Sequence, residues 1–213
     1  MRLNWIVVVA SLGLAACTQS PTRAALHAPK ENVVTPQDEE AAKRVRINYQ
    51  PVAWPLKFKR HNFGAYCYDT QFCSVWYGGL ESGSDKPSPP SSKYGPGYLD
   101  HWTGGYSVNN FPPPAEVTWR SKDGTEHRAE IDIGDIFKDE LIRHHVSREE
   151  VPAELASGTM DLVTTPNILL EVNDRAIRVY MRPWIPLKKQ IEIAGQMRSD
   201  IYDDLIMVKT TTY

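Results

Sequence analysis

Hydrophobic and polar residues alternate along much of the chain after residue 47, which is the pattern of half-buried β-strands. The clearest example is the pair of segments 115–120 and 126–133, which flank Lys122-Asp123-Gly124. An Asp-Gly pair between two alternating segments is a strong hairpin signal, because glycine readily adopts the positive φ that a tight turn needs. We therefore expect an antiparallel hairpin here.

A second hairpin is predicted from residues 168–172 and 176–181, with its turn at Asn173-Asp174. Residues 56–59 alternate between apolar and basic side chains and are a further strand candidate. Short apolar stretches at residues 72–77 and 205–208 are two more.

One helix is predicted as well. Asp135 is a suitable N-cap for a helix whose apolar face is formed by Ile136, Phe137, Leu141 and Ile142. These elements predict a mainly β fold of the α+β kind: an antiparallel β-sandwich, or a sheet of hairpins, with one or two short helices.

Cys67 and Cys73 are six residues apart, and in an exported chain, as the N-terminal segment 1–17 described next indicates, such a pair favours a structural disulfide. Their Cα atoms would lie roughly 20 Å apart in an extended chain, whereas a disulfide needs less than about 7 Å. The chain must therefore turn within residues 68–71, and we expect the flanking segments to form a hairpin.

The N-terminus has the features of a secretion signal. Arg2 precedes an apolar run over residues 5–16, which is too short to cross a bilayer as a helix. The run ends in Leu14-Ala15-Ala16-Cys17, which resembles the lipobox of bacterial lipoproteins. This resemblance implies cleavage before Cys17 and lipidation of that cysteine, so that the protein is anchored on the periplasmic side of the cell envelope, with the outer membrane favoured.

Three parts are expected on this basis: a signal peptide over residues 1–16, a lipidated flexible tether over 17–46, and a single β-rich domain over 47–213. The tether is polar and contains three prolines but no sustained strand pattern. Cleavage removes one basic residue, leaving 23 Lys and Arg against 26 Asp and Glu. This balance gives no indication of nucleic-acid binding, and no later apolar stretch is long enough to span a membrane.

Aromatic residues are concentrated in a long segment rich in glycine, proline and serine, residues 78–105, and just after it. Such residues supply large contact areas at binding surfaces. The candidate partner-binding residues here are Tyr94, Tyr98, His101, Trp102 and Tyr106. The alternative is that these rings fold back over the β core beneath them. Arg178, Tyr180 and Arg182 share one strand face and form a second candidate surface, for which an ordinary solvated sheet face is the alternative.

No catalytic, metal-binding or cofactor-binding motif is present in the sequence. His144 and His145 are adjacent, so on a helix they would point about 100° apart and could not ligate one metal as an i, i+4 pair can. A Ser/His/Asp triad assembled from distant positions leaves no sequence signature, so a hydrolase stays an alternative.

Two segments carry a family resemblance: residues 111–133, beginning FPPPAEVTWRSKDGTEH, and residues 169–180, beginning LLEVNDR. They resemble a family of small Gram-negative lipoproteins, many of which are type VI secretion system immunity proteins. The resemblance implies a non-enzyme that binds and neutralises a cognate secreted effector of the lipase or phospholipase class in the periplasm. The competing interpretation is a constitutive envelope lipoprotein with a structural or assembly role.

Overall fold

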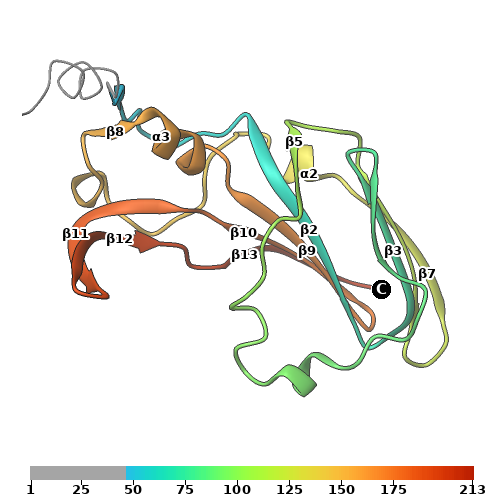
Figure 1. Cartoon of the computed structure of the whole chain (residues 1–213). Coiled ribbons are helices and arrows are strands. Elements are labelled where there is room, and N and C mark those ends of the chain that lie inside the picture. Colours follow the sequence, from blue (N-terminus) through green and yellow to red (C-terminus); the bar gives the residue numbers. More distant parts are fainter. Residues whose placement is uncertain (1–46) are drawn as a thin grey trace, which may run out of the picture. The chain divides into compact units, whose positions relative to one another are not determined.

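The computed structural model describes residues 47–213, which contain thirteen strands and only short helices (Figure 1). The predicted mainly β fold is therefore confirmed. The predicted signal peptide and tether, including Cys17, lie outside the described residues. No helix among the described residues is both long enough and apolar enough to span a membrane.

Five strands form the larger sheet, in the order β13-β10-β9-β2-β5. Neighbouring strands run antiparallel except for β2 and β9, which are parallel. The strands are β2 (Arg60–Tyr68), β5 (Tyr106–Asn109), β9 (Asn167–Asn173), β10 (Ala176–Arg182) and β13 (Ile206–Thr212).

Four antiparallel strands form the second sheet, in the order β4-β3-β6-β7. They are β3 (Thr70–Tyr77), β4 (Leu80–Ser84), β6 (Ala115–Ser121) and β7 (Glu126–Ile131). The two sheets form the layers of a sandwich, because alternate residues of both contribute to one buried core. Phe63, Ile168, Leu170, Val75 and Val117 are all completely buried there.

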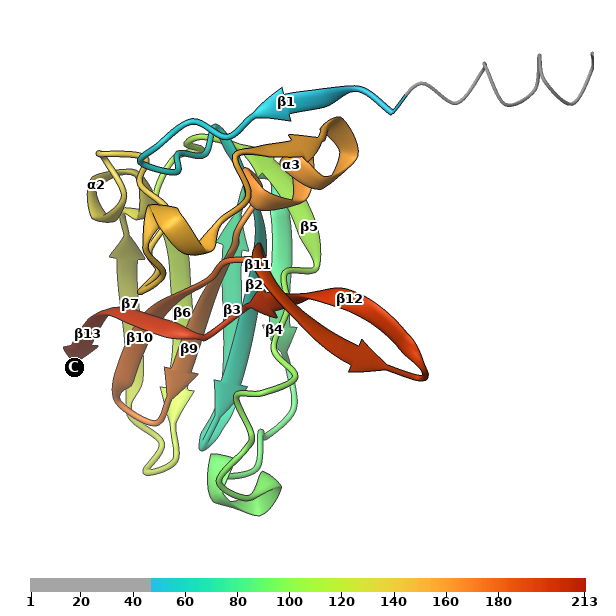
Figure 2. The same cartoon turned by 90° about the vertical axis from the view of Figure 1, so that its left-hand side faces the viewer.

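The remaining elements lie around this sandwich. β1 (Tyr49–Pro51) pairs with β8 (Glu154–Ala156), which leads directly into α3 (Ser157–Val163). β11 (Ile185–Ile193) and β12 (Gln196–Tyr202) pair only with each other and project from the sandwich as a ribbon (Figure 2).

Both hairpins predicted from turn chemistry are confirmed. β6 and β7 pair across a turn in which Gly124 has a φ of 88°. β9 and β10 also pair, but the turn residues are Asp174 and Arg175 because Asn173 is still paired with Ala176. The predicted closing strand is the beginning of β13, which is longer than expected and pairs with β10.

Cys67 and Cys73 form the predicted disulfide, with their Cα atoms 6.3 Å apart. The hairpin expected around them is wrong, because β2 belongs to the five-stranded sheet and β3 to the four-stranded sheet. Asp69, with a φ of 51°, turns the chain from one layer into the other. The disulfide therefore joins the two sheets.

The predicted helix is also corrected. The cap is Asp132, whose side chain accepts a hydrogen bond from the backbone N–H of Asp135, and α2 (Ile133–Ile136) is only four residues long. Leu141 lies beyond it and forms an isolated bridge with Lys57. The predicted strand at residues 56–59 is reduced to that bridge, although Leu56 and Phe58 are buried as their alternation implies.

Candidate partner-binding site

The outer face of the five-stranded sheet, which points away from the sandwich core, is covered by the segment between β4 and β5. We call residues 85–105 the covering loop. Together with the sheet it forms a second, smaller core, whose buried members are Tyr68, Trp102, Leu169 and Tyr180. Outward-facing side chains of β2, β9 and β10 form the floor of this core, because strand residues alternate between the two faces.

Trp102 is the centre of the second core, with 3% of its surface exposed. Its ring stacks on Tyr66, with centroids 4.4 Å apart and planes inclined by 1°, and it lies nearly parallel to Tyr68. The indole N–H donates a hydrogen bond of 3.1 Å to the Tyr68 hydroxyl. For Trp102 the alternative interpretation is therefore correct: the ring folds back over the sheet and anchors the loop.

Glu171 is a completely buried carboxylate beneath the covering loop. It accepts hydrogen bonds from Tyr98 and Asn173 on one oxygen and from Tyr180 and Arg178 on the other, at 2.9 to 3.1 Å. Four donors satisfy a carboxylate, so its burial is compensated. Sequence reasoning missed this residue, whose one local signal is that it is the single acid in the apolar strand ILLEVN.

The tyrosines around Glu171 remain neutral donors. Burial raises the pKa of Tyr98 and of Tyr180, and the negative charge of Glu171 raises both further. Their hydroxyl groups therefore keep their protons at neutral pH and can donate to the carboxylate. Tyr98 thereby links the covering loop to β9 and β10.

Arg182 provides a second anchor for the loop. Its two terminal nitrogens donate to the carbonyl oxygens of Leu99 and Asp100, at 2.9 and 2.7 Å. The face formed by Arg178, Tyr180 and Arg182, which was predicted as a separate candidate surface, thus lies against the covering loop. The structure brings the two predicted sets together, with the strand residues supporting the loop.

The covering loop and β2 enclose a surface groove of about 480 Å³. Six of its lining residues carry rings: Tyr66, Tyr68, Tyr94, Tyr98, His101 and Trp102. Tyr94 is 57% exposed, so it is accessible to a partner, and His101 is exposed as well. Tyr106 does not belong to the groove, because its ring packs against the main core and its hydroxyl donates to the carbonyl oxygen of Tyr77.

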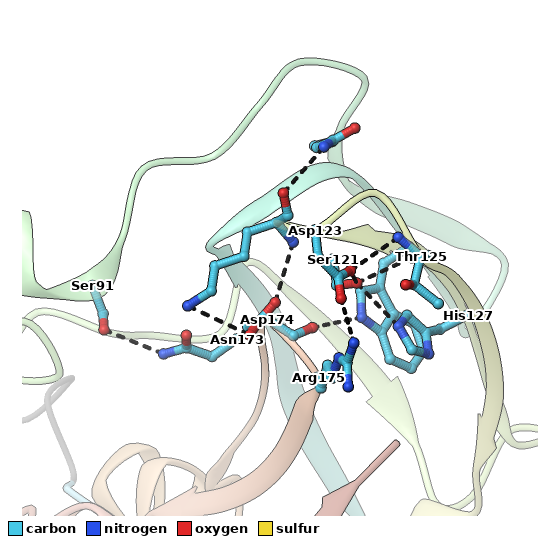
Figure 3. Close-up of polar contacts among 11 residues, drawn as sticks. Ser91, Ser121, Asp123, Thr125, His127, Asn173, Asp174 and Arg175 are labelled. Carbon is cyan, nitrogen blue, oxygen red and sulfur yellow. Dashed lines mark hydrogen bonds and ion pairs between the residues drawn. The ribbon is translucent and has the colours of Figure 1, made fainter.

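A Ser–His–Asp contact lies in the turn between β6 and β7 (Figure 3). Ser121 Oγ is 3.1 Å from His127 Nε2 and 2.6 Å from Asp123 Oδ1. In a catalytic triad the serine hydroxyl donates to the histidine, and the acid holds the other side of the imidazole. Here the acid binds the serine itself, and Ser121 is completely buried. This arrangement is not that of a triad.

The same residues connect the two hairpin turns. Arg175 forms an ion pair with Asp123, and the backbone N–H of Lys122 donates to Asp174 at 3.1 Å (Figure 3). Hydrogen bonds from Ser121, from Thr125 and from Arg175 hold the pKa of Asp123 below its usual range. We interpret this network as a structural link between the two sheets.

The adjacent histidines are not in a helix, and both line a surface hollow of about 310 Å³ beside Pro55 and Ile206. His144 packs its ring against Trp54, with centroids 5.1 Å apart, and its burial lowers its pKa. The backbone N–H of His145 donates to the Tyr202 hydroxyl. Within residues 47–213, no group of three or more His, Cys, Asp and Glu side chains is arranged to hold a metal ion.

Comparison of the chain with protein-family models, curated proteins and solved structures gives no match.

Proposed function

We propose that this chain is a lipid-anchored binding protein of the bacterial envelope that neutralises a secreted effector by direct contact, without catalysis. The observation that supports this most is the aromatic groove on the covering loop. The loop is fixed to the sheet by Trp102, by the buried Glu171 and by Arg182. A groove held in this way loses little conformational entropy when a partner binds.

Exposed rings on a fixed scaffold are typical of binding hot spots. Tyr94 and His101 are the groove residues that can contact a partner without disturbing the second core. This separates the candidate residues into two groups. Tyr94 and His101, with the exposed part of Tyr98, form the contact surface, whereas Trp102, Arg178, Tyr180 and Arg182 support it.

The family resemblance supplies the proposed partner: a type VI secretion effector of the lipase or phospholipase class that acts in the periplasm. A lipid on Cys17 would hold the domain close to the membrane on which such an effector acts. Replacement of Cys17 by serine should then release the protein from the membrane fraction, and unchanged membrane association would refute the anchor.

The decisive experiment is a competition assay. A strain lacking this gene should be killed by a sibling with an active type VI secretion system, and the intact gene should restore survival. Survival of the deletion strain would contradict immunity and favour a constitutive envelope role.

The proposal predicts that the effector is encoded beside this gene, and titration of the product of such a neighbouring gene into the full-length protein tests the site. The double variant Tyr94→Ala/His101→Ala should weaken binding by about 2 kcal/mol or more, as expected for a hot spot. Trp76→Ala is a matched control, because Trp76 is 50% exposed but lies on the four-stranded sheet. Equal affinities of the two variants would exclude the groove as the binding site.

A further inference from the structure

A second hollow lies directly beside the aromatic groove, where the covering loop meets the start of β13. Its volume is about 650 Å³. Leu99, Leu205 and Met207 provide apolar lining, and Met207 is 54% exposed. Asp100 lines both the groove and this hollow, so the two form one continuous surface.

The charge of this surface is negative. Asp100, Asp203 and Asp204 are all exposed, and none of them has an ion-pair partner within residues 47–213. Arg182 is the one Lys or Arg side chain that lines the hollow. Its terminal nitrogens are already bound to the carbonyl oxygens of Leu99 and Asp100, so they are not available to these carboxylates. The three carboxylates therefore have no Lys or Arg partner in the hollow, although Asp204 contacts the Tyr202 hydroxyl and His145 also lines it.

The aromatic groove also favours a positively charged partner, but by a different interaction. Tyrosine and tryptophan rings attract cations to their faces, and arginine in particular stacks on them. One face of Tyr66 is stacked on Trp102, yet Tyr66 is only half-buried and lines the groove, so part of its ring is accessible. Aromatic rings and unpaired carboxylates on one continuous surface thus select the same partner chemistry.

We propose that the groove and the acidic hollow together bind an arginine- or lysine-bearing segment of the protein partner. One cationic side chain stacks on the rings of the groove, and a second enters the hollow between Asp100 and the pair Asp203 and Asp204. Its alkyl stem lies along Leu205 and Met207, as long basic side chains do when their charged end remains polar. This inference specifies the partner chemistry of the proposed function and rests on it.

The first test uses synthetic peptides as probes of the full-length protein. A glycine–arginine peptide should shift the amide NMR signals of Asp100 and Met207. Its citrulline counterpart, which has the same shape but no charge, should bind about tenfold more weakly. Added salt should weaken the arginine peptide but not the citrulline peptide. Equal binding of both peptides, or no binding of the arginine peptide, would overturn the proposal.

The second test uses the effector that the proposed function predicts, with two double variants of this chain. Asp203→Asn/Asp204→Asn removes two charges from the hollow, and Glu130→Gln/Glu192→Gln removes two exposed charges elsewhere on the domain. The first variant should slow association and weaken binding about tenfold, and the control should change binding less than twofold. Equal behaviour of the two variants would refute the inference but leave the proposed function intact. If the wild-type chain binds no effector, the proposed function fails, and the peptide experiment still decides the inference.

Discussion

The inner face of the five-stranded sheet packs against the four-stranded sheet, whereas its outer face is covered by the loop of residues 85–105. Most of the inner contacts are made by aliphatic side chains such as Ile168, Leu170 and Val179. The outer contacts are made by tyrosines and Trp102, with the carboxylate of Glu171 buried among them. Both faces exclude water, but they do so with different chemistry.

This difference in chemistry implies that the inner contacts mainly stabilise the fold, whereas the outer contacts mainly fix the position of the covering loop. Aliphatic contacts are non-directional, and their contribution grows with the area that is buried. The hydroxyl, indole and guanidinium groups of the outer face must instead find specific partners, so they fix the position of the loop. The inner face thus maintains the fold, while the outer face holds a recognition surface in one arrangement.

Phe63→Ala should have the largest effect. Phe63 is completely buried on the inner face, and its removal should lower the free energy of unfolding by about 4 kcal/mol. Chemical denaturation measures the loss, and Phe63→Leu, which leaves a smaller cavity, should lose less. A loss below about 1 kcal/mol would mean that the inner face does not dominate stability.

Glu171→Ala should have the next largest effect, about 3 kcal/mol, because four donors lose their acceptor and Arg178 loses its partner. The loss should be accompanied by faster proteolytic cleavage within residues 85–105 under native conditions. Glu171→Gln keeps the size of the side chain and two polar atoms, so it should lose less. If cleavage of the loop does not change, Glu171 does not fix the loop.

His61 should make the stability of the inner face depend on pH. It is completely buried, its Nδ1 donates to Asn110 and its Nε2 accepts from Tyr77, and desolvation lowers its pKa. Below the unfolded-state pKa of 6.5, the unfolded chain takes up a proton that the folded chain resists. The free energy of unfolding should therefore fall as the pH decreases from 6.5, and it should level off above that value.

Denaturant titrations at several pH values measure this slope, and the variant His61→Gln should flatten it. Because burial also lowers the pKa of His144, the comparison is best made in a His144→Gln background. An unchanged slope after removal of His61 would contradict the assignment.

Tyr94→Ala should have the smallest effect on stability, within about 0.5 kcal/mol, because the ring is 57% exposed. Thermal unfolding checks this value. A substantial loss of stability would place Tyr94 among the supporting residues and not on the contact surface.

Local signals predicted the hairpins well and failed where the partner was remote. Asp123-Gly124 specifies a turn through its own chemistry, so β6 and β7 could be located from the sequence. The spacing of Cys67 and Cys73 requires a turn but does not say whether the flanking strands pair or enter different layers. The β11–β12 ribbon was missed because its turn, Ala194-Gly195, lacks the Asn or Asp that usually marks such a turn.

The site shows the same limit. Composition identified the covering loop as rich in aromatic residues, and strand alternation placed Arg178, Tyr180 and Arg182 on one face. Their contact with each other depends on the parallel pairing of β2 with β9, which joins segments about a hundred residues apart. Glu171 was missed because its importance comes from four donors, one of which, Tyr98, lies 73 residues away in sequence.

The ribbon of β11 and β12 has a different consequence. A two-stranded ribbon is only marginally stable in water. In this ribbon 48% of the surface of Ile193 and 64% of that of Met197 are exposed, so little apolar burial supports it. Its backbone hydrogen bonds should therefore break and re-form without any unfolding of the sandwich. Amide hydrogen exchange in the outer part of the ribbon would then report its own local opening equilibrium, and mutations that change the sandwich core would leave that equilibrium nearly unaltered.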